Sequence, residues 1–207
     1  MYRLDKLSNS PYSSSLSGEA LRLREMRMLA RLKLAGKTDS EITQVITSEN
    51  SFQYNVRSKY TKKVLRYGLE RLKALDSKDL VKVVAEGSLD DAKLVCLYSA
   101  MLTNRILWEF MVCVIGNKYN SFDSLYVYDA EKFLKQTREQ NPKTVTWSDS
   151  TLSAIAKSIR SFLYDAGILD KKTKRLKELF VPQVLLDAIE KLNTPQVFNA
   201  FNYFKKQ

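Results

Sequence analysis

The sequence predicts a mainly all-α protein, a helical bundle with a helix-turn-helix-like N-terminal unit and a winged-helix-like C-terminal module that includes a short β-hairpin. Apolar residues recur at helical spacing through most of the chain, and no sustained alternation typical of a large sheet appears. The 207 residues include only 6 Gly and 4 Pro, and 44% are hydrophobic, so the chain can bury a core. We expect a basic three-helix unit at 1–75, a central apolar helical region at 76–142 and a basic winged-helix-like module at 143–207.

Three helices are predicted in the N-terminal region. Apolar side chains at helical spacing place the first at 16–34, and Gly36 follows it as a C-cap. Thr38 and Glu41 have the spacing of a capping box at the start of a second, short helix. The third helix is expected at 57–75. Three helices of these lengths with short connections have helix-turn-helix proportions.

The central region is predicted to contain one long, buried helix that Ser88 caps and whose apolar run covers 94–116. Arg105 and Glu109 lie four residues apart near its middle, a spacing that allows them to pair. These charges argue against a membrane span, because each costs about 2.5–3.5 kcal/mol at the centre of a membrane helix. A further helix is expected at 130–140.

The two cysteines, Cys96 and Cys113, both fall within this predicted long helix. Because a continuous helix holds them too far apart for a disulfide, we expect two buried, reduced thiols. Reduced thiols are typical of the cytosol, and the N-terminal residues lack the apolar core of a secretory signal. The sequence therefore predicts a cytoplasmic protein with no membrane attachment.

The C-terminal region has the order of elements typical of a winged helix. A helix capped by Ser148 or Ser150 ends at Gly167, and the segment GIL, the basic turn DKKTKR and the segment LKELFVP follow. We expect the two apolar segments to pair as a β-hairpin that forms the wing. Two short helices, each with Pro at or near its first position, are expected to complete the region.

The chain contains no histidine, which removes most hydrolase triads and zinc sites, because His is the usual general base at neutral pH and the commonest zinc ligand. It also lacks the phosphate-binding loop, the dinucleotide-binding glycines and paired metal-binding cysteines. We therefore expect a protein that is not an enzyme, with no catalytic residues and no cofactor or metal.

The formal net charge of +11 and a pI near 9.5 favour a polyanionic partner, with nucleic acid as the leading candidate. Basic side chains that can neutralise phosphates gather on the first and third N-terminal helices, on the 148–167 helix and in the basic turn. For each group the alternative is a solvated surface or a site that docks an acidic protein. The candidate DNA-binding residues are Arg24, Arg27, Arg31, Arg57, Lys59, Lys62, Lys63, Arg66, Lys157, Arg160, Lys171, Lys172, Lys174, Arg175 and Lys177.

The segment YSSSLSGEALRLREMRMLARLKLAGKTDSEITQVITSENSFQYN resembles the start of the BrxA family, small accessory proteins of bacteriophage exclusion (BREX) phage-defence systems. The resemblance continues through VRSKYTKKVLRYGLERLKAL and LVCLYSAMLTNRILWEFM and covers essentially the whole chain. It implies a nearly all-helical cytoplasmic protein, likened to an RNA-binding antitermination factor, that binds DNA within a larger assembly of defence proteins. It implies no active-site residues.

The expected function is therefore binding of double-stranded DNA, mainly through its phosphates and without strong sequence preference, beside other BREX proteins. One alternative is an adaptor whose basic ends dock acidic surfaces of other defence components. Another is an RNA-binding protein, for which Tyr119, Phe122, Tyr126 and Tyr128 offer aromatic rings for base stacking. The oligomeric state is left open, with a monomer preferred.

Overall fold

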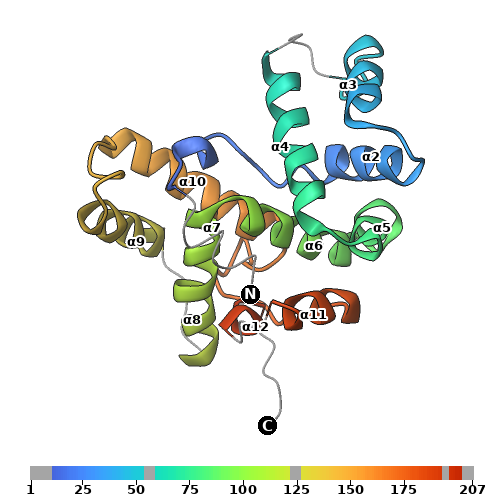
Figure 1. Ribbon diagram of the computed structural model, residues 1–207. Helices are drawn as coiled ribbons and strands as arrows, with labels where there is room; N and C mark the ends of the chain where they lie inside the picture. Colours follow the sequence, from blue (N-terminus) through green and yellow to red (C-terminus); the bar gives the residue numbers. More distant parts are fainter. Residues whose placement is uncertain (1–10, 54–58, 122–126, 193–195, 202–207) are drawn as a thin grey trace.

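A computed structural model describes residues 11–53, 59–121, 127–192 and 196–201, and they form a helical assembly (Figure 1). The prediction of a mainly all-α protein is confirmed. The helices are the 3₁₀ turn η1 (Ser14–Leu16), α2 (Leu23–Leu34), α3 (Asp39–Ser48), α4 (Lys59–Leu75), α5 (Lys78–Glu86), α6 (Leu89–Thr103), α7 (Arg105–Glu109), the π-helix η2 (Phe110–Ile115), α8 (Gly116–Ser121), α9 (Val127–Gln140), α10 (Asp149–Asp165), α11 (Gln183–Glu190) and α12 (Gln196–Ala200).

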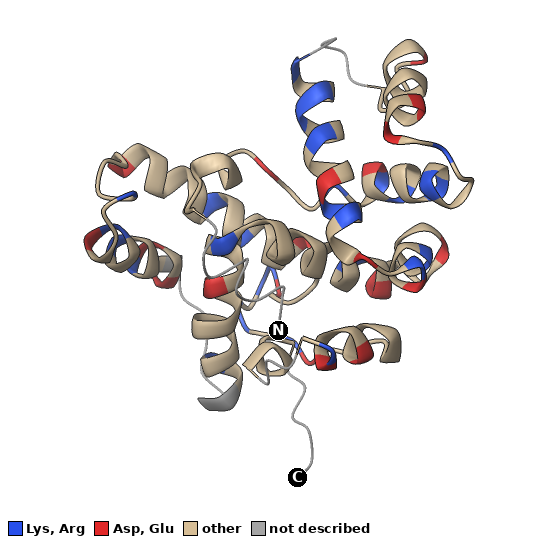
Figure 2. Cartoon of the chain, viewed as in Figure 1, with Lys and Arg blue, Asp and Glu red and all other residues tan. Residues whose placement is uncertain are grey.

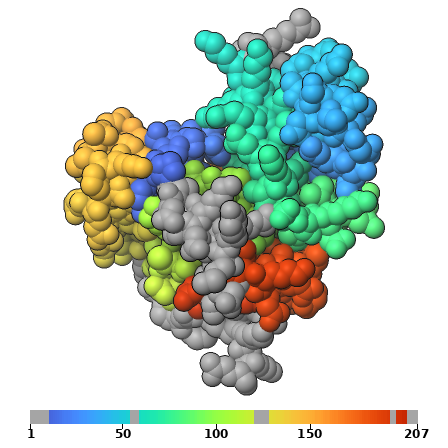
Figure 3. All heavy atoms as spheres, viewed as in Figure 1, coloured from blue at the N-terminus to red at the C-terminus, as the bar shows by residue number. Residues whose placement is uncertain are grey.

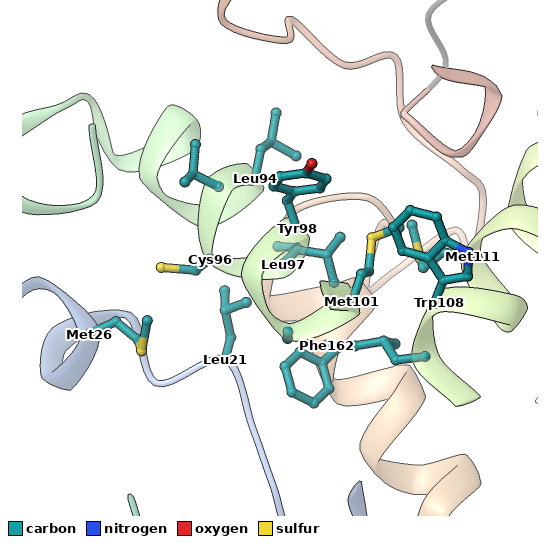
Figure 4. Packing of buried hydrophobic residues seen from close by; sticks show 14 of the residues in the cluster. Leu21, Met26, Leu94, Cys96, Leu97, Tyr98, Met101, Trp108, Met111 and Phe162 are labelled. Atoms are coloured by element: carbon teal, nitrogen blue, oxygen red, sulfur yellow. The ribbon is translucent and has the colours of Figure 1, made fainter. Parts of the chain in front are cut away.

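Helix α6 is the centre of the core. Every side chain from Leu94 to Met101 is buried, so the helix is enclosed on all sides, as expected for a helix that is apolar all round. Helices α4 and α5 both pack on it, and Figure 4 shows Met26 of α2 and Phe162 of α10 near it as well. Helices from the first and last parts of the chain therefore share one core. The division of the chain after residues 75 and 142 stays a prediction.

The first helix is shorter than expected. Gly18 and Arg22 have positive φ angles of 76° and 53°, and this left-handed backbone interrupts the helix that the apolar spacing predicts over 16–34. The region instead forms η1 and, after an irregular segment, α2. The capping box at the next helix is confirmed, because the Thr38 hydroxyl accepts the Glu41 N–H and the Glu41 carboxylate accepts the Thr38 N–H.

The prediction of one continuous helix through 94–116 is wrong. The chain breaks at Asn104, and the axes on either side differ by 117°. The side-chain oxygen of Asn104 accepts the Leu107 N–H at 3.2 Å and so caps α7, which begins at the next residue. Beyond the break the predicted ion pair is confirmed, with Arg105 Nε 2.7 Å from Glu109 Oε1.

The break also changes the surroundings of the two cysteines. Both thiols are free, and Cys96 is buried as expected, but Cys113 is exposed on the π-helix η2. Within the described part of the chain, no single helix is both long and apolar enough to span a membrane. Among the helices of the described residues, one bent pair, Leu89–Thr103 with Arg105–Tyr119, passes that test of length and composition when taken together.

The β-hairpin of the expected winged-helix-like module is not formed. In the described residues the two segments make one isolated antiparallel bridge, between Leu169 and Leu176, and no strand. A turn built on Asp170 fills the space between them, and the chain then runs as irregular structure to α11. The helix before it is confirmed, with Ser148 as its N-cap and Gly167 in a left-handed conformation after its end.

Candidate nucleic-acid interface

The N-terminal half of α4 carries an open basic surface. Lys59, Lys62 and Arg66 are exposed, and they make no hydrogen bond or ion pair with any described residue. Their spacing of three and four residues places them on one face of the helix. Figure 2 marks the basic residues in this half of α4 as blue bands. We call these three residues the α4 basic face. Arg57, also a candidate, lies outside the described residues.

Lys63 is on the same helix but is half-buried, and its ammonium donates to the carbonyl oxygen of Ser17 at 3.2 Å. It therefore holds the segment before α2 against α4. The opposite side of α4 is buried and crosses α2 closely at Gly68, where a β-carbon would lie 2.5 Å from the Leu29 side chain. These contacts fix the α4 basic face in one orientation.

The three candidate arginines of α2, Arg24, Arg27 and Arg31, which we call the α2 stripe, all donate to other parts of the protein, whereas phosphate contacts would need free guanidinium groups. Arg27 Nη2 donates to the carbonyl oxygen of Gly87 at 3.0 Å, and Arg31 Nε donates to that of Ala85 at 3.2 Å. Both carbonyls lie at the C-terminal end of α5, where backbone acceptors have no partners within the helix. Arg24 donates to the Gln53 side chain at 2.8 Å. Two of the three arginines thus stabilise a helix end.

Two candidates on α10 also differ from each other. Lys157 is exposed and makes no hydrogen bond or ion pair within the described chain. Arg160 is half-buried and faces Glu131 of α9, with an Nη1–Oε1 distance of 3.9 Å. The neighbouring hydroxyl of Ser158 accepts the Gly18 N–H at 3.2 Å, so the segment that Lys63 holds also contacts α10.

The turn after α10, residues 170–177, is the second open basic surface, and we call it the basic loop. One carboxylate oxygen of Asp170 accepts the backbone N–H groups of Lys172 at 2.9 Å and Thr173 at 2.7 Å. The hydrogen bonds from Thr173, followed by the one from Lys172, lower the pKa of Asp170. Lys174 adopts a left-handed backbone with φ 59°. The loop's basic residues, all exposed, are Lys171, Lys172, Lys174, Arg175 and Lys177.

Only part of the aromatic set proposed for base stacking is open to solvent. Tyr119 is buried, and its hydroxyl donates to the carbonyl oxygen of Lys177 at 2.8 Å, which anchors the end of the basic loop. Tyr128 is exposed, and Phe122 and Tyr126 lie outside the described residues. The sequence reasoning missed Phe180, which follows the basic loop and is 86% exposed. Its position in an apolar segment, LKELFVP, gave no sign of this exposure.

The described residues thus define a helical protein that presents cationic side chains on α4, α10 and the basic loop. The chain belongs to the BrxA family, whose family model matches residues 10–193. This confirms the resemblance seen in the sequence and identifies a member of a family from BREX phage-defence systems. That the chain is not an enzyme stays a prediction.

Two relatives and one solved structure support the assignment. The chain is 30% identical over 181 residues to the BREX protein BrxA of Bacillus cereus (strain H3081.97), covering 86% of this chain and 88% of that protein. It is 26% identical over 190 residues to the BREX protein BrxA of Paramagnetospirillum magneticum (strain ATCC 700264 / AMB-1), covering 90% and 94%. The crystal structure of an uncharacterized protein from Magnetospirillum magneticum matches with a TM-score of 0.76 and 26% identity, covering 93% of this chain and 98% of that one.

Proposed function

We propose that this chain binds double-stranded DNA through its phosphates, with little sequence preference, as a non-catalytic component of a BREX phage-defence system that works beside other BREX proteins. The observation that carries the proposal is the α4 basic face, whose three cations are exposed and free of acidic partners among the described residues. A solvated helix face in a folded protein more often interleaves both signs of charge.

The α4 basic face supports phosphate binding by counterion release. Each cation that neutralises a phosphate frees a condensed counterion, so the affinity falls steeply as the salt concentration rises. Such contacts carry no base information, which is why we propose weak sequence preference. Because Lys63 and the crossing at Gly68 hold α4 in place, the helix that carries the three cations is already oriented before the partner arrives, and only their exposed side chains have to be ordered.

The basic loop is the proposed second contact, and Lys157 the third. The Asp170 turn and the Tyr119 hydroxyl hold the ends of the loop, so its cations are carried on an ordered turn. The ammonium of Lys174 donates to the carbonyl oxygen of Lys171 and lies over the ring of Tyr164, so the proposed contacts are those of Lys171, Lys172, Arg175 and Lys177. We assign Arg27 and Arg31 a structural role instead, since both donate to the C-terminal carbonyls of α5.

The test is charge reversal with a matched control. The variant Lys59→Glu/Lys62→Glu/Arg66→Glu should weaken duplex binding at least about tenfold for every sequence tested. The control Lys78→Glu/Lys82→Glu/Lys132→Glu changes three exposed lysines on α5 and α9 and carries the same net charge. It should lose much less affinity. Equal losses in the two variants would reject the α4 site and leave only the overall charge as the attraction.

A second candidate function is protein docking through the basic loop. Phe180, 86% exposed, comes three residues after Lys177, and an exposed aromatic beside cations is typical of a protein-binding surface. In this case Phe180→Ala would abolish association with an acidic protein partner while duplex binding persists. Loss of duplex binding in Phe180→Ala would instead assign the ring to the DNA contact.

A further inference from the structure

A groove of about 540 Å³ lies between α5 and α11, and none of the three residues of the α4 basic face lines it. Figure 3 shows the two helices lying against each other at the right of the molecule, α5 in green and α11 in red. The floor is apolar, and charged side chains of α5 form one rim. The lining residues are Asp79, Lys82, Val83, Glu86, Gly87 and Val184. We call this the acidic groove.

The floor of the acidic groove is fixed by the end of α5. A β-carbon on Gly87 would lie 2.6 Å from the carbonyl oxygen of Val83, so only glycine fits without a shift of the backbone. Arg27 donates to the carbonyl oxygen of the same glycine from the α2 side. The groove is therefore a built feature of the fold.

The charge around the groove is opposite to that of the whole protein. Residues 76–93 contain five acidic and three basic side chains, and residues 178–190 contain three acidic and no basic ones, in a chain of net charge +11. Figure 2 marks acidic residues in red on both α5 and α11, beside blue basic residues on α5. The lining itself carries two carboxylates, Asp79 and Glu86, and one ammonium, Lys82. This surplus of negative charge favours a cationic occupant over a phosphate backbone.

Two of the most exposed large apolar side chains lie close to the lining residues in the chain. Leu89, 60% exposed, comes two residues after Gly87, and Phe180 comes four residues before Val184. The floor offers no converging polar groups of the kind that orient a small ligand, because the charged lining residues all belong to α5. Apolar surface bordered by charge is characteristic of a site for a protein segment.

We propose that the acidic groove docks a segment of a partner protein that inserts aliphatic side chains between α5 and α11 and places Lys or Arg residues beside Asp79 and Glu86. Apolar burial supplies the attraction, and the opposite charges select the partner and its orientation. The α4 basic face and the acidic groove then allow the protein to hold a nucleic acid and a basic protein segment at once. This inference does not depend on DNA binding.

The test uses a synthetic amphipathic peptide of about 15 residues, with Leu at i, i+3, i+4 and i+7 on one face and Lys at the other positions. Its binding to the full chain is followed by fluorescence anisotropy, beside the same peptide with Glu in place of Lys. We expect the Lys peptide to bind and the Glu peptide to bind at least about tenfold more weakly. Absence of binding by the Lys peptide, or equal binding of both, would overturn the proposal.

Variants then locate the site. Asp79→Lys/Glu86→Lys should weaken binding of the Lys peptide about tenfold, and the control Glu49→Lys/Glu139→Lys, with the same charge change at exposed positions elsewhere, should alter it less than about twofold. Val184→Arg, at a half-buried valine of the lining, fills the groove and should also abolish binding, with Val145→Arg at an exposed valine as the control. If Val184→Arg does not fold, the variant Asp79→Lys/Glu86→Lys, here called the rim variant, tests the site alone, because both of its residues are exposed.

Sedimentation of the chain without peptide tests the other possible occupant of the groove, a second copy of this chain. If the wild type self-associates and Asp79→Lys/Glu86→Lys abolishes the association, a second copy fills the groove and the proposal fails. Duplex affinity serves as the independent readout, since the rim variant should retain it or increase it. Loss of peptide binding with retained DNA binding therefore separates this inference from the proposed function.

Discussion

Arg71 of α4 and Glu19 of the segment before α2 form a buried ion pair, with Nη2 2.6 Å from Oε2 and side chains 1% and 9% exposed. Arg71 Nη1 also donates to the carbonyl oxygen of Ala20 at 2.8 Å. The guanidinium lies over the rings of Tyr67 and Phe162, 4.3 and 5.1 Å from their centroids. Because Phe162 belongs to α10, one side chain joins the N-terminal segment, α4 and the C-terminal region.

Removal of this cation should be strongly destabilising. Arg71→Met leaves the Glu19 carboxylate buried without its partner, and breaking a buried pair in this way costs about 3–5 kcal/mol. Urea denaturation measures the loss. The double variant Arg71→Met/Glu19→Leu removes both charges and should recover much of it. A loss below about 1 kcal/mol in Arg71→Met would show that the pair does not hold the three segments together.

The arginines of α2 and the lysines of α4 should respond in opposite ways. Arg27→Ala and Arg31→Ala each remove a hydrogen bond to the end of α5 and should lower the free energy of unfolding by about 0.5–1.5 kcal/mol with little change in duplex affinity. Lys62→Ala should weaken duplex binding and alter stability by less than about 0.5 kcal/mol. Urea midpoints and anisotropy on the same samples measure both. If Arg27→Ala and Arg31→Ala weakened duplex binding while Lys62→Ala did not, the arginines of α2 would be the DNA site instead.

The break at Asn104 predicts that the two thiols differ in reactivity. Cys96 is fully enclosed, and burial raises its pKa to about 12, whereas Cys113 is exposed on η2. Since the thiolate is the reactive form, Ellman's reagent should titrate one thiol in the native protein and two after unfolding in guanidinium. Cys113→Ser should abolish the native reaction. Two reactive native thiols, or none, would contradict the arrangement around the break.

The start of α3 should be sensitive to acid. Hydrogen bonds from the Thr38 backbone and hydroxyl lower the pKa of Glu41 below its ordinary value of 4.5. A carboxylate whose pKa is lower in the folded than in the unfolded state stabilises the fold at pH values above its unfolded-state pKa. This stabilisation is lost as the pH falls through the folded-state pKa. An NMR titration should therefore find Glu41 titrating below pH 4.5, with Thr38→Ala moving its pKa part of the way back. An unchanged pKa in Thr38→Ala would show that the hydroxyl bond is absent in solution.

Local signals in the sequence predicted the helix ends well. The pair Thr38 and Glu41, Ser88 before α6 and Ser148 before α10 all act as caps, because capping depends on residues within three positions of each other. The break at Asn104 was missed, since the apolar pattern continues on both sides of it. The prediction of a hairpin wing was wrong, because in the described residues the pairing of its two segments ends after the single bridge between Leu169 and Leu176.

The roles of individual basic residues depend on contacts that are distant in sequence. Arg27 and Arg31 bond to carbonyls 60 and 54 residues away, which no local pattern reveals. The exposure of Lys59, Lys62 and Arg66 follows from the helical spacing that buries the opposite side of α4, whereas their role in DNA binding stays a prediction. Phe180 and the acidic groove depend on how α11 lies against α5, which composition and spacing do not determine.

The salt dependence of binding to one labelled DNA duplex tests the central claim most directly. Anisotropy titrations at several salt concentrations, with matched single-stranded DNA and duplex RNA, yield the slope of log affinity against log salt. We predict tight duplex binding and a steep negative slope that Lys59→Glu/Lys62→Glu/Arg66→Glu flattens by roughly one unit per lost contact. No duplex binding near physiological salt, about 0.15 M, or an unchanged slope in that variant, would contradict a phosphate-binding surface on α4.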